Sequence, residues 1–542
     1  MTQTERHDVI VVGAGFSGLY LLHQLRTRGF DCLLIEAAPG VGGTWFWNRY
    51  PGARCDIPSV EYSYSFSPDL EREWQWTERY AAQPEILRYL EHVADRFDLR
   101  RDIRLSTRVM AAQWDEDADL WHVSLDTGEC VDARHLIMAT GCLSAPKLPE
   151  WPGIERFTGT IMHTGHWDAG VSLEGKRVAV VGTGSSGVQV IPQIAQQAQH
   201  LTVFQRTPNF AVPASNRPLD PAELAALAPR KATLREAARQ SPLGWFDGPC
   251  PGSAKAADAA ARMERFEQQW NAGTTGLLLA FEDLLVDEES NALAADFARG
   301  KIRELVKDPE TARKLTPLGF PIGSRRLCSE IGFYEAMNRE NVSLVDVRED
   351  PVVEVTAQEI VTASGRHPVD VIVFATGFFA MTGAISAIDV RGAGGLSLKE
   401  EWAEAPRSYL GLAVAGFPNL FTVTGPGSPS VLSNVVVSIE QHVDWIADCL
   451  AAMRENGLTR IEADAEAEQA WMEHVDEVAW QTLFPRGPSW YQGRTRDGRS
   501  VFMPYVGGVG AYRARCDEVA AQGYAGFRLD GPAAPVAQDG AS

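Results

Sequence analysis

Two glycine-rich sequences constrain the fold of this chain more than any other feature, GAGFSG at positions 13–18 and GTGSSG at positions 182–187. Each follows a largely apolar run, 9–12 or 177–181, as expected for a parallel strand buried on both faces. GxGxxG after such a strand is typical of the turn in a dinucleotide-binding unit, where glycines let the backbone approach a pyrophosphate. We therefore predict an α/β protein with two Rossmann-like dinucleotide-binding domains. The residues assigned to the two turns are Gly13, Gly15, Gly18, Gly182, Gly184, Ser185, Ser186 and Gly187.

The residues that end the second strand of each unit distinguish the two nucleotides. The strand 32–35 ends at Glu36, which stands where an acidic side chain holds a ribose hydroxyl. The corresponding strand 201–205 ends at Arg206 and Thr207. An arginine there matches a ribose 2′-phosphate, so NADPH is favoured over NADH for the second unit.

The loop 42–56 follows the first unit closely. Its three glycines, one proline and two tryptophans suit backbone that wraps against a flat aromatic ring, which the isoalloxazine of a flavin would supply. An aromatic surface turn is the alternative. Asp56, at the end of the loop, would be a solvated carboxylate unless a cation faces it.

Two further apolar strands end in the same tripeptide, Ala-Thr-Gly, at 139–141 and 375–377. Such strand ends are typical of two sheets in which a later strand leads back beneath a bound dinucleotide, after which the chain crosses to the other domain. Asp220-Pro221 and Asp308-Pro309 combine an N-cap with a first-turn proline, so helices are expected between them. We predict a FAD-binding domain at 1–148 and 377–530, an NADP-binding domain at 149–218 and 321–376, a helical insertion at 219–320 and a disordered tail at 531–542.

The stretch 157–168, FTGTIMHTGHWD, lies between the two fingerprints. It is predicted to join the two units rather than to belong to either core, and we place the function at this joint. The adjacent arginines 325 and 326 follow a Pro/Gly turn and would usually be a solvated pair. In this acidic chain they could equally form a local site for anionic cofactor groups or reaction intermediates.

Charge and cysteine usage exclude several classes of partner. The net charge of −21 argues against nucleic acid or an anionic membrane, since such surfaces would repel the protein. The eight cysteines show no metal-ligand or redox-pair spacing, so no metal is expected and the thiols fit a cytoplasmic protein. The apolar run 9–22 falls short of the ~18 apolar residues that a membrane-spanning helix requires.

Two signatures resemble those of the type I Baeyer–Villiger monooxygenases. The first consists of Phe157, Gly159, His163, Trp167 and Asp168, placed between two GxGxxG motifs. The second runs from Gly42-Gly43-x-Trp45 through Tyr50-Pro51-Gly52 to Asp56. The likeness covers nearly the whole chain and is nearest to the phenylacetone and steroid monooxygenase branch. Related flavin monooxygenases that oxidise amines or sulfur share the Phe, Gly and His of the first signature but not its Trp-Asp ending.

The resemblance implies roles for individual residues. Arg326 would be the active-site arginine with Asp56 as its carboxylate partner, and His163 would act structurally at the interdomain hinge. Arg206, Thr207 and Arg325 would hold the 2′-phosphate and Trp490 the nicotinamide side of NADP. The other cofactor-binding residues are Gly43, Thr44, Trp45, Tyr62, Ala375, Thr376 and Gly377, and the substrate pocket would include Cys55, Ser430, Val431 and Leu432.

The same resemblance implies a reaction. NADPH would reduce FAD, O2 would add to the reduced flavin, and the peroxide formed would attack a small ketone to give an ester or lactone, with Arg326 stabilising the tetrahedral adduct. Sulfide oxidation is an expected side activity, and the protein is expected to be a monomer. Three alternatives stay open: an amine- or sulfide-oxidising flavin enzyme, against which Trp167-Asp168 argues, a disulfide reductase, disfavoured because no close cysteine pair follows Gly18, and a flavin-binding redox sensor.

Overall fold

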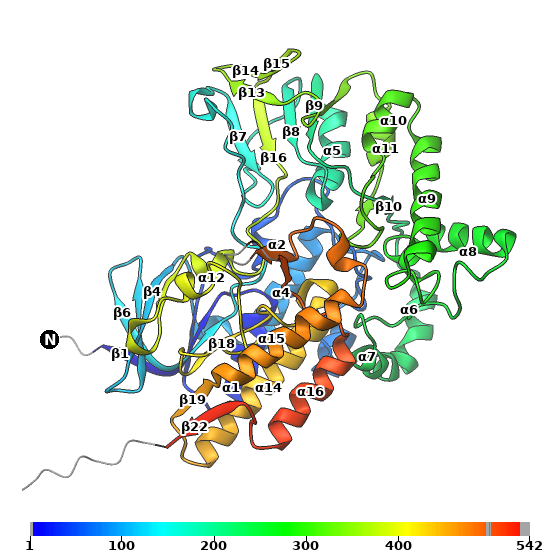
Figure 1. Cartoon of the computed structure of the whole chain (residues 1–542). Helices are drawn as coiled ribbons and strands as arrows, with labels where there is room; N and C mark the ends of the chain where they lie inside the picture. The colour runs from blue at the N-terminus through cyan, green and yellow to red at the C-terminus, as the bar shows by residue number, and fades with distance from the viewer. Residues whose placement is uncertain (1–3, 495–497, 499, 532–542) are drawn as a thin grey trace, which may run out of the picture.

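An eight-stranded sheet occupies the lower left of the molecule in Figure 1, within a computed structural model that describes residues 4–494, 498 and 500–531. The order is β17 (Asp389–Arg391), β4 (Val109–Asp115), β5 (Leu120–Leu125), β6 (Cys130–Met138), β1 (Glu5–Val12), β2 (Cys32–Ile35) and β3 (Ile103–Arg104), with β18 (Leu420–Thr422) also on β6. The strands beside β1 run parallel to it. Their apolar runs are buried on both faces, as predicted for the first unit.

Helices cover this first sheet. The helix α1 (Phe16–Thr27) starts at the first fingerprint and packs against α14 (Val435–Glu455). The residue before α14, Asn434, caps it by accepting the N–H of Val436 at 3.2 Å. In Figure 1, α15 (Ala465–Trp480) and α16 (Val509–Ala521) lie beside α14.

A second, five-stranded sheet forms the upper part of Figure 1, and all of its strand pairs are parallel. The order is β12 (Val342–Asp346), β9 (His200–Gln205), β8 (Arg177–Val181), β16 (Val371–Phe374) and β7 (Thr160–His163). The helix α5 (Ser185–Gln197) starts at the second fingerprint. The two units together confirm the predicted α/β class.

The edge strand β7 corrects one prediction. The stretch 157–168 is not excluded from both cores, because its residues 160–163 pair with β16 in the second sheet. The physical reason is the open edge of β16, whose backbone N–H and C=O groups need partners. The joint between the units is therefore built partly from a strand of the second one.

All residues of 219–320 are described, and every element among them is a helix. These are α6 (Pro221–Leu227), η3 (Ala228–Arg230), α7 (Lys231–Gln240), α8 (Ala259–Ala272), η4 (Gly276–Leu279), α9 (Glu288–Leu305) and α10 (Pro309–Leu315). The predicted N-caps are confirmed, since Asp220 accepts the N–H of Ala222 and Asp308 that of Thr311. The chain enters and leaves this region through the parallel pair β10 (Ala211–Pro213) and β11 (Cys328–Glu330). The exact domain limits stay a prediction.

The other elements are short or peripheral. They are α2 (Thr44–Trp47), α3 (Pro68–Glu73), α4 (Gln83–Arg96), η1 (Arg100–Asp102), η2 (Ile154–Arg156), α11 (Phe333–Met337), β13 (Val352–Val355), β14 (Glu359–Thr362), β15 (Arg366–Pro368), α12 (Gly383–Ser386), η5 (Ala393–Gly395), α13 (Leu398–Glu401), η6 (Ser430–Leu432), β19 (Arg460–Ala463), η7 (Phe484–Arg486), β20 (Gln492–Arg494), β21 (Ser500–Phe502) and β22 (Phe527–Asp530). The predicted disordered tail, apart from Gly531, lies outside the described residues.

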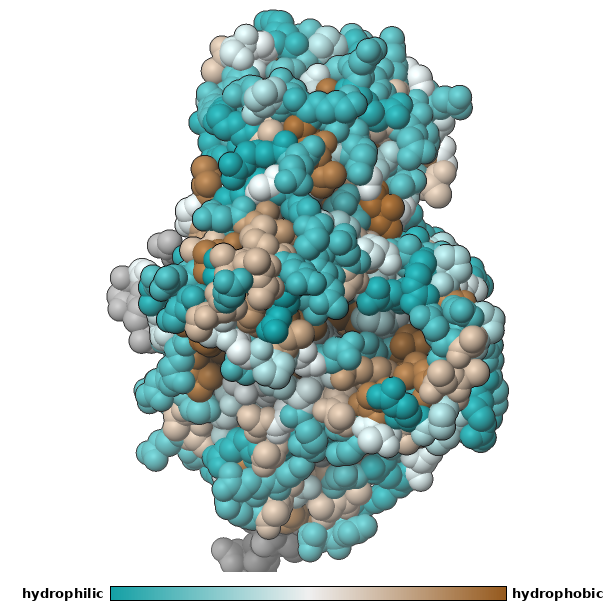
Figure 2. Space-filling view, turned by 90° about the vertical axis from the view of Figure 1, so that its right-hand side faces the viewer, coloured by the Kyte–Doolittle hydropathy of each residue, from teal (hydrophilic) through white to brown (hydrophobic). Residues whose placement is uncertain are grey.

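The surface on the side of the helical insertion is mostly hydrophilic. Figure 2 shows teal residues over most of this face, with hydrophobic side chains in small separate groups. Within the described part of the chain, no helix combines the length and the apolar character needed to cross a membrane.

The two fingerprints repeat the same close backbone approach. A Cβ on Gly13 would lie 2.6 Å from the carbonyl oxygen of Ala139, and one on Gly182 would lie 2.5 Å from that of Ala375. Both glycines have φ above +100°, where side chains are strained. The two Ala-Thr-Gly exits therefore return beside the turns, as the sequence predicts.

The third glycine of each fingerprint allows the helix to pack against its own turn. A Cβ on Gly18 would lie 1.8 Å from the oxygen of Gly13, and one on Gly187 would lie 2.1 Å from that of Gly182. Neither backbone oxygen can move without displacing the turn. Only glycine fits at these two helical positions.

We expect Gly18→Ala to lower the free energy of unfolding by about 3 kcal/mol or more, because a backbone clash cannot relax as a side-chain clash can. The matched control is Gly300→Ala in α9, where a Cβ meets nothing within 4 Å. There alanine should raise stability by up to about 1 kcal/mol through helix propensity. Urea unfolding of both variants measures this, and a neutral Gly18→Ala would contradict it.

Candidate active site

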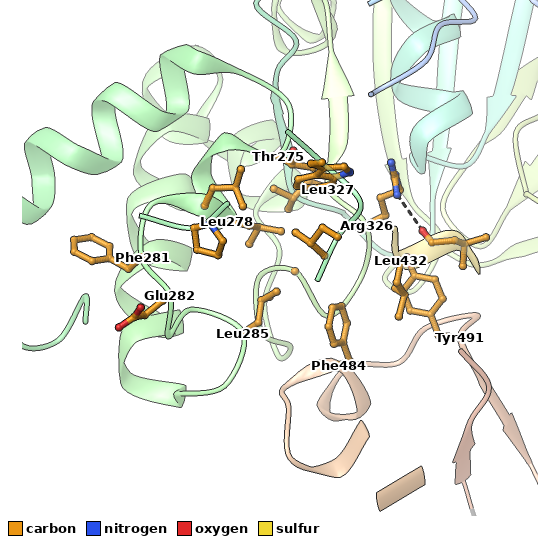
Figure 3. Close-up of a pocket in the computed structure, with 16 residues that line it drawn as sticks. Thr275, Leu278, Phe281, Glu282, Leu285, Arg326, Leu327, Leu432, Phe484 and Tyr491 are labelled. Atoms are coloured by element: carbon orange, nitrogen blue, oxygen red, sulfur yellow. Dashed lines mark hydrogen bonds between the residues drawn. The ribbon is translucent and has the colours of Figure 1, made fainter. Parts of the chain in front are cut away.

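Arg326 and Asp56 form a two-pronged ion pair between segments far apart in the sequence. The Nε of Arg326 donates to Oδ2 of Asp56 at 2.5 Å, and its Nη2 donates to Oδ1 at 2.7 Å. The remaining nitrogen, Nη1, donates to the carbonyl oxygen of Val431 at 3.0 Å, the dashed line in Figure 3. A cation therefore faces Asp56, which excludes the solvated-loop alternative for this carboxylate.

The charge of Arg326 is stabilised in place. Burial lowers the pKa of Arg326, but the charge of Asp56 and its hydrogen bonds outweigh burial and hold that pKa above its usual value. The guanidinium thus stays protonated at any pH at which the protein is folded. Its side chain remains 24% exposed, so it is accessible to a small molecule.

A pocket lies against Arg326, with about 650 Å³ of space that includes the open solvent at its mouth. Figure 3 shows its side chains gathered from the helical insertion, the arginine loop, η6 and the segment near η7. The lining consists of Leu243, Trp245, Pro249, Thr275, Leu278, Leu279, Phe281, Glu282, Leu285, Gly323, Arg326, Leu327, Val431, Leu432, Phe484 and Tyr491. Most of these side chains are apolar, so the pocket suits an apolar molecule that presents one polar group to the guanidinium.

The pocket includes only part of the predicted substrate site. Val431 and Leu432 line it, whereas Ser430 and Cys55 do not. The Ser430 side chain is fully buried with its Oγ 3.8 Å from the sulfur of Met381, and Cys55 is 5% exposed. Both side chains are therefore buried and absent from the lining of this pocket.

The sequence analysis did not predict that the helical insertion and the segment 484–491 contribute walls to the pocket. A usable signal was the run Gly276–Leu279, four apolar residues between polar helices. Gly323 sits tightly against this wall, since a Cβ there would lie 2.7 Å from the side chain of Leu285. Tyr491 closes the pocket beside Arg326, and burial raises the pKa of this tyrosine to about 12.

The first glycine turn is joined to two neighbouring segments. The two carboxylate oxygens of Glu36 accept the N–H groups of Ala14 and Ala38, each at 2.7 Å, and burial raises the pKa of Glu36. A Cβ on Gly43 would lie 2.8 Å from the Cα of Gly15, so the loop after Glu36 approaches the turn closely. This places the acidic residue and both glycine loops at one edge of the sheet, where an ADP-type ligand binds in such folds.

The aromatic loop after this turn is packed inward. The Nε1 of Trp45, beside Thr44, donates to the hydroxyl of Tyr62 at 3.2 Å, and Trp45 is 8% exposed. The ring of Tyr62 also meets Phe16 at the start of α1, with the ring centres 5.2 Å apart. The alternative of an aromatic surface turn is therefore wrong for Trp45, whereas Trp47 is only half-buried.

Two arginines of the second unit act on each other, Arg206 directly after β9 and Arg325 shortly before β11. The guanidinium of Arg325 lies 4.7 Å from the centre of the Phe320 ring and donates to the carbonyl oxygen of Pro488 at 2.5 Å. Burial and, after it, the charge of Arg206 lower the pKa of Arg325. Two like charges held near one another favour an anionic ligand between them. The carbonyl oxygen of Thr207 accepts the Thr183 hydroxyl at 3.5 Å.

The other predicted residues of the second turn lie around the start of α5. Gly184 precedes the helix, and a Cβ there would meet nothing within 4 Å, so the turn is open above it. Ser185 faces Cys328 with 3.7 Å between Oγ and Sγ, and the Ser186 hydroxyl interacts with Tyr50 of the aromatic loop. Trp490 is 39% exposed, with its ring centre 4.3 Å from that of Tyr491.

His163 connects the family signature to the second chain crossing. Its Nδ1 accepts the N–H of Gly165 at 2.9 Å, so its Nε2 carries the proton and donates to the carbonyl oxygen of Gly377 at 3.1 Å. Burial lowers the pKa of His163 to about 4. Beside it, the hydroxyl of Thr376 donates to the carbonyl oxygen of Lys147 in the first crossing. A neutral histidine with both nitrogens engaged suits a structural role.

The other signature residues flank this strand. A Cβ on Gly159 would lie 2.3 Å from the carbonyl oxygen of Asp370, and Phe157 packs against the core of the second sheet. Trp167 packs on the other face of that sheet, and the carboxylate of Asp168 accepts the N–H of Gly170 at 2.8 Å. These residues shape the joint, and none of them lines the pocket at Arg326.

A cluster of potential metal ligands lies on the β5–β6 hairpin, formed by His122, Cys130 and Asp132. Nδ1 of His122 is 2.7 Å from Asp132, and its Nε2 is 3.1 Å from Asp115. The hydrogen bond with Asp132 outweighs burial and raises the pKa of His122. Because a metal requires the deprotonated ring, this arrangement favours an ion-paired imidazolium.

The lowered pKa of His163 makes stability depend on pH. Between about pH 6.5 and pH 4 the unfolded state binds the proton more strongly, so stability is full above this window and falls as the pH drops through it. We expect the loss between pH 7 and pH 5.5 to be about 1 kcal/mol smaller in His163→Gln than in the wild type. Urea unfolding at the two pH values measures this, and equal losses would contradict it.

A Baeyer–Villiger monooxygenase from Pseudooceanicola batsensis is 41% identical over 534 residues, which cover 98% of this chain and 97% of that protein. The chain belongs to the Baeyer–Villiger monooxygenase family. A phenazine N-monooxygenase from Lysobacter antibioticus is 44% identical over 96% of this chain and 97% of its own length. Residues 10–229 match the family described as pyridine nucleotide-disulphide oxidoreductase. All eight cysteines are free.

Solved structures share this fold along its whole length. An oxidised steroid monooxygenase bound to NADP has a TM-score of 0.92 and 49% identity, covering 97% of this chain and all of that one. A complex of OTEMO with FAD and NADP has a TM-score of 0.94 and 40% identity, again over 97% of this chain and all of that one. The family resemblance stated from the two signatures is therefore confirmed.

Proposed function

We propose that this family member inserts one oxygen atom of O2 beside the carbonyl of an apolar ketone, with Arg326 stabilising the charge that develops. The observation that supports this most directly is the Arg326–Asp56 pair at the end of a largely apolar pocket. A fixed positive charge beside an apolar pocket favours any step that builds negative charge on a substrate oxygen. NADPH, FAD, O2 and the ketone are the small molecules required.

The residues present fit both cofactors. The first turn, with Gly13, Gly15 and Glu36, and the aromatic loop would hold FAD, because their glycines leave room for close approach. The second turn, with Arg206 and Arg325, would hold the 2′-phosphate of NADPH. When bound, NADPH supplies hydride and FAD supplies the oxygen-activating chemistry.

The chain's own residues position and stabilise charge. Arg326 stays protonated because Asp56 offsets the cost of burying it, so it can neutralise an oxyanion without giving up a proton. The carbonyl oxygen of Val431 fixes the third guanidinium nitrogen and turns the group toward the pocket. Tyr491 and Leu327 line the same pocket beside it.

A second candidate is oxygenation of a nitrogen heterocycle, which the 44% identical phenazine N-monooxygenase favours. Its flat apolar substrate class would also suit the lining of the pocket. The two reactions differ in the need for Arg326, since a nitrogen lone pair attacks oxygen without forming a substrate oxyanion. Sulfide oxidation, the proposed side activity, would also not require Arg326.

The proposed cytoplasmic location rests on the free thiols. Light scattering would test the proposed monomeric state.

The experiment is product analysis with the FAD-loaded enzyme, NADPH and O2 on an aryl ketone, phenazine and a methyl aryl sulfide. We expect an ester from the ketone, and we expect Arg326→Ala to lower its rate on the order of a hundredfold or more while NADPH is still oxidised. Asp56→Asn should act in the same direction, because it leaves a buried charge unpaired. Ester formation by Arg326→Ala at the wild-type rate would refute the role of this arginine. Exclusive conversion of phenazine would favour the second candidate.

We expect Arg206→Ala and Arg325→Ala each to raise KM for NADPH by about tenfold or more with little effect on NADH, because a charge-assisted hydrogen bond is lost. The matched control is Arg454→Ala. That guanidinium also lies over a phenylalanine ring, at 4.2 Å, and also donates to backbone carbonyls, but it is in α14. Steady-state kinetics with both coenzymes measures this. An equal change for NADH, or for Arg454→Ala, would remove the 2′-phosphate assignment.

A further inference from the structure

One wall of the pocket is a loop rather than a helix or strand. The segment 243–249, between α7 and α8, contributes Leu243, Trp245 and Pro249 to the lining. Its first part is held by Asn434, whose N–H donates to the carbonyl oxygen of Leu243 at 2.8 Å. Its middle is held by Glu61, whose carboxylate accepts the N–H of Phe246 at 2.8 Å. The position of this wall thus depends on one backbone group and one side chain outside the helical insertion.

Glu61 connects this wall to two other parts of the site. Its carbonyl oxygen accepts hydrogen bonds from Nδ2 of Asn434 at 2.9 Å and from Nη1 of Arg235 at 3.0 Å. Asn434 caps α14 directly after η6, whose Val431 accepts a hydrogen bond from Arg326. Glu61 also follows Asp56 in the same loop. Glu61 therefore bonds to the wall through its carboxylate and, through its backbone carbonyl, to the residue that caps α14.

Burying the Glu61 carboxylate carries a free-energy penalty. The residue is 7% exposed, and burial raises its pKa to about 7, partly offset by the bond from Phe246. The charged groups that act on it are Asp247, which raises this pKa, and Arg235 and Arg79, which lower it. A buried carboxylate destabilises a protein relative to a neutral side chain unless it makes specific contacts. Here the specific contact is with the pocket wall.

We propose that Glu61 is a positioning residue that holds the wall formed by Leu243, Trp245 and Pro249, and thereby sets how bulky a ketone can reach Arg326. The effect on ketone size rests on the proposed function, whereas the positioning of the wall by Glu61 does not depend on it. The bond to Phe246 acts at the centre of the loop, between the two residues Trp245 and Asp247. Loss of this bond frees the Trp245 side chain to move into the cavity.

The first test measures the wall without any reaction. We compare hydrogen–deuterium exchange at the Phe246 amide in the FAD-loaded wild type, Glu61→Ala and Glu61→Gln. Loss of one hydrogen bond should speed exchange about tenfold in Glu61→Ala, while glutamine keeps an acceptor oxygen and should restore slow exchange. The matched control is Glu468→Ala, another buried glutamate that accepts a single backbone N–H, from Ala415 at 3.0 Å. Unchanged exchange in Glu61→Ala would overturn the proposal.

The second test separates bulky from small substrates. We expect Glu61→Ala to raise KM several-fold for an aryl or polycyclic ketone and to leave KM for acetone and NADPH unchanged, with glutamine restoring the wild-type value. A protonated carboxyl group, like the glutamine amide, keeps an acceptor oxygen, so KM of the wild type for the bulky ketone should stay the same as the pH falls through about 7.

The outcomes of the two tests are distinguishable. An equal rise in KM for both ketones, or the same rise in Glu468→Ala, would show a general structural effect and would overturn the specificity role. If the wild type oxidises no ketone, the proposed function fails, and the exchange experiment still decides whether Glu61 holds the wall.

Discussion

A positive charge placed against an apolar pocket is the constraint on which this structure depends. Arg326 is tolerated there because Asp56 supplies two hydrogen bonds and a counter-charge, and because Val431 satisfies the third nitrogen. These three residues come from loops that are hundreds of positions apart in the sequence. Two sheets and a helical insertion must be assembled before they meet, so the charged site exists only in the complete fold.

The joint between the sheets is held by groups that do not titrate near neutral pH. His163 is kept neutral by burial and bonds to Gly165 on its own side and to Gly377 where the chain crosses back. A charged group at this position would require a counter-ion inside the joint. The neutral ring instead provides one donor and one acceptor, so both of its nitrogens are bonded without a charge inside the joint.

The sequence predicts the two units well because their signals are local. A buried strand, GxGxxG and a charged residue at the end of the next strand lie within a short span, and the glycine contacts show why no other residue fits. The strand formed by the family signature is harder to predict from the sequence. Only the pairing of Thr160 with Val371 shows that this strand extends the second sheet. The pocket is harder still. Its walls at Leu278 and at Phe484 and Tyr491 come from two segments far apart in the sequence, and no local pattern indicates which loops meet.

The way in which the helical insertion joins the second unit has a consequence for how such chains diverge. Its two ends run side by side as β10 and β11, with Ala211 opposite Cys328 and Pro213 opposite Glu330. When the ends of a long segment are already paired, changing its length alters the loop-closure entropy only logarithmically. The insertion can therefore be lengthened, shortened or exchanged as a module with little thermodynamic penalty to the glycine turns. The substrate range can therefore change through the helical insertion while the glycine turns that bind the coenzymes are kept unchanged.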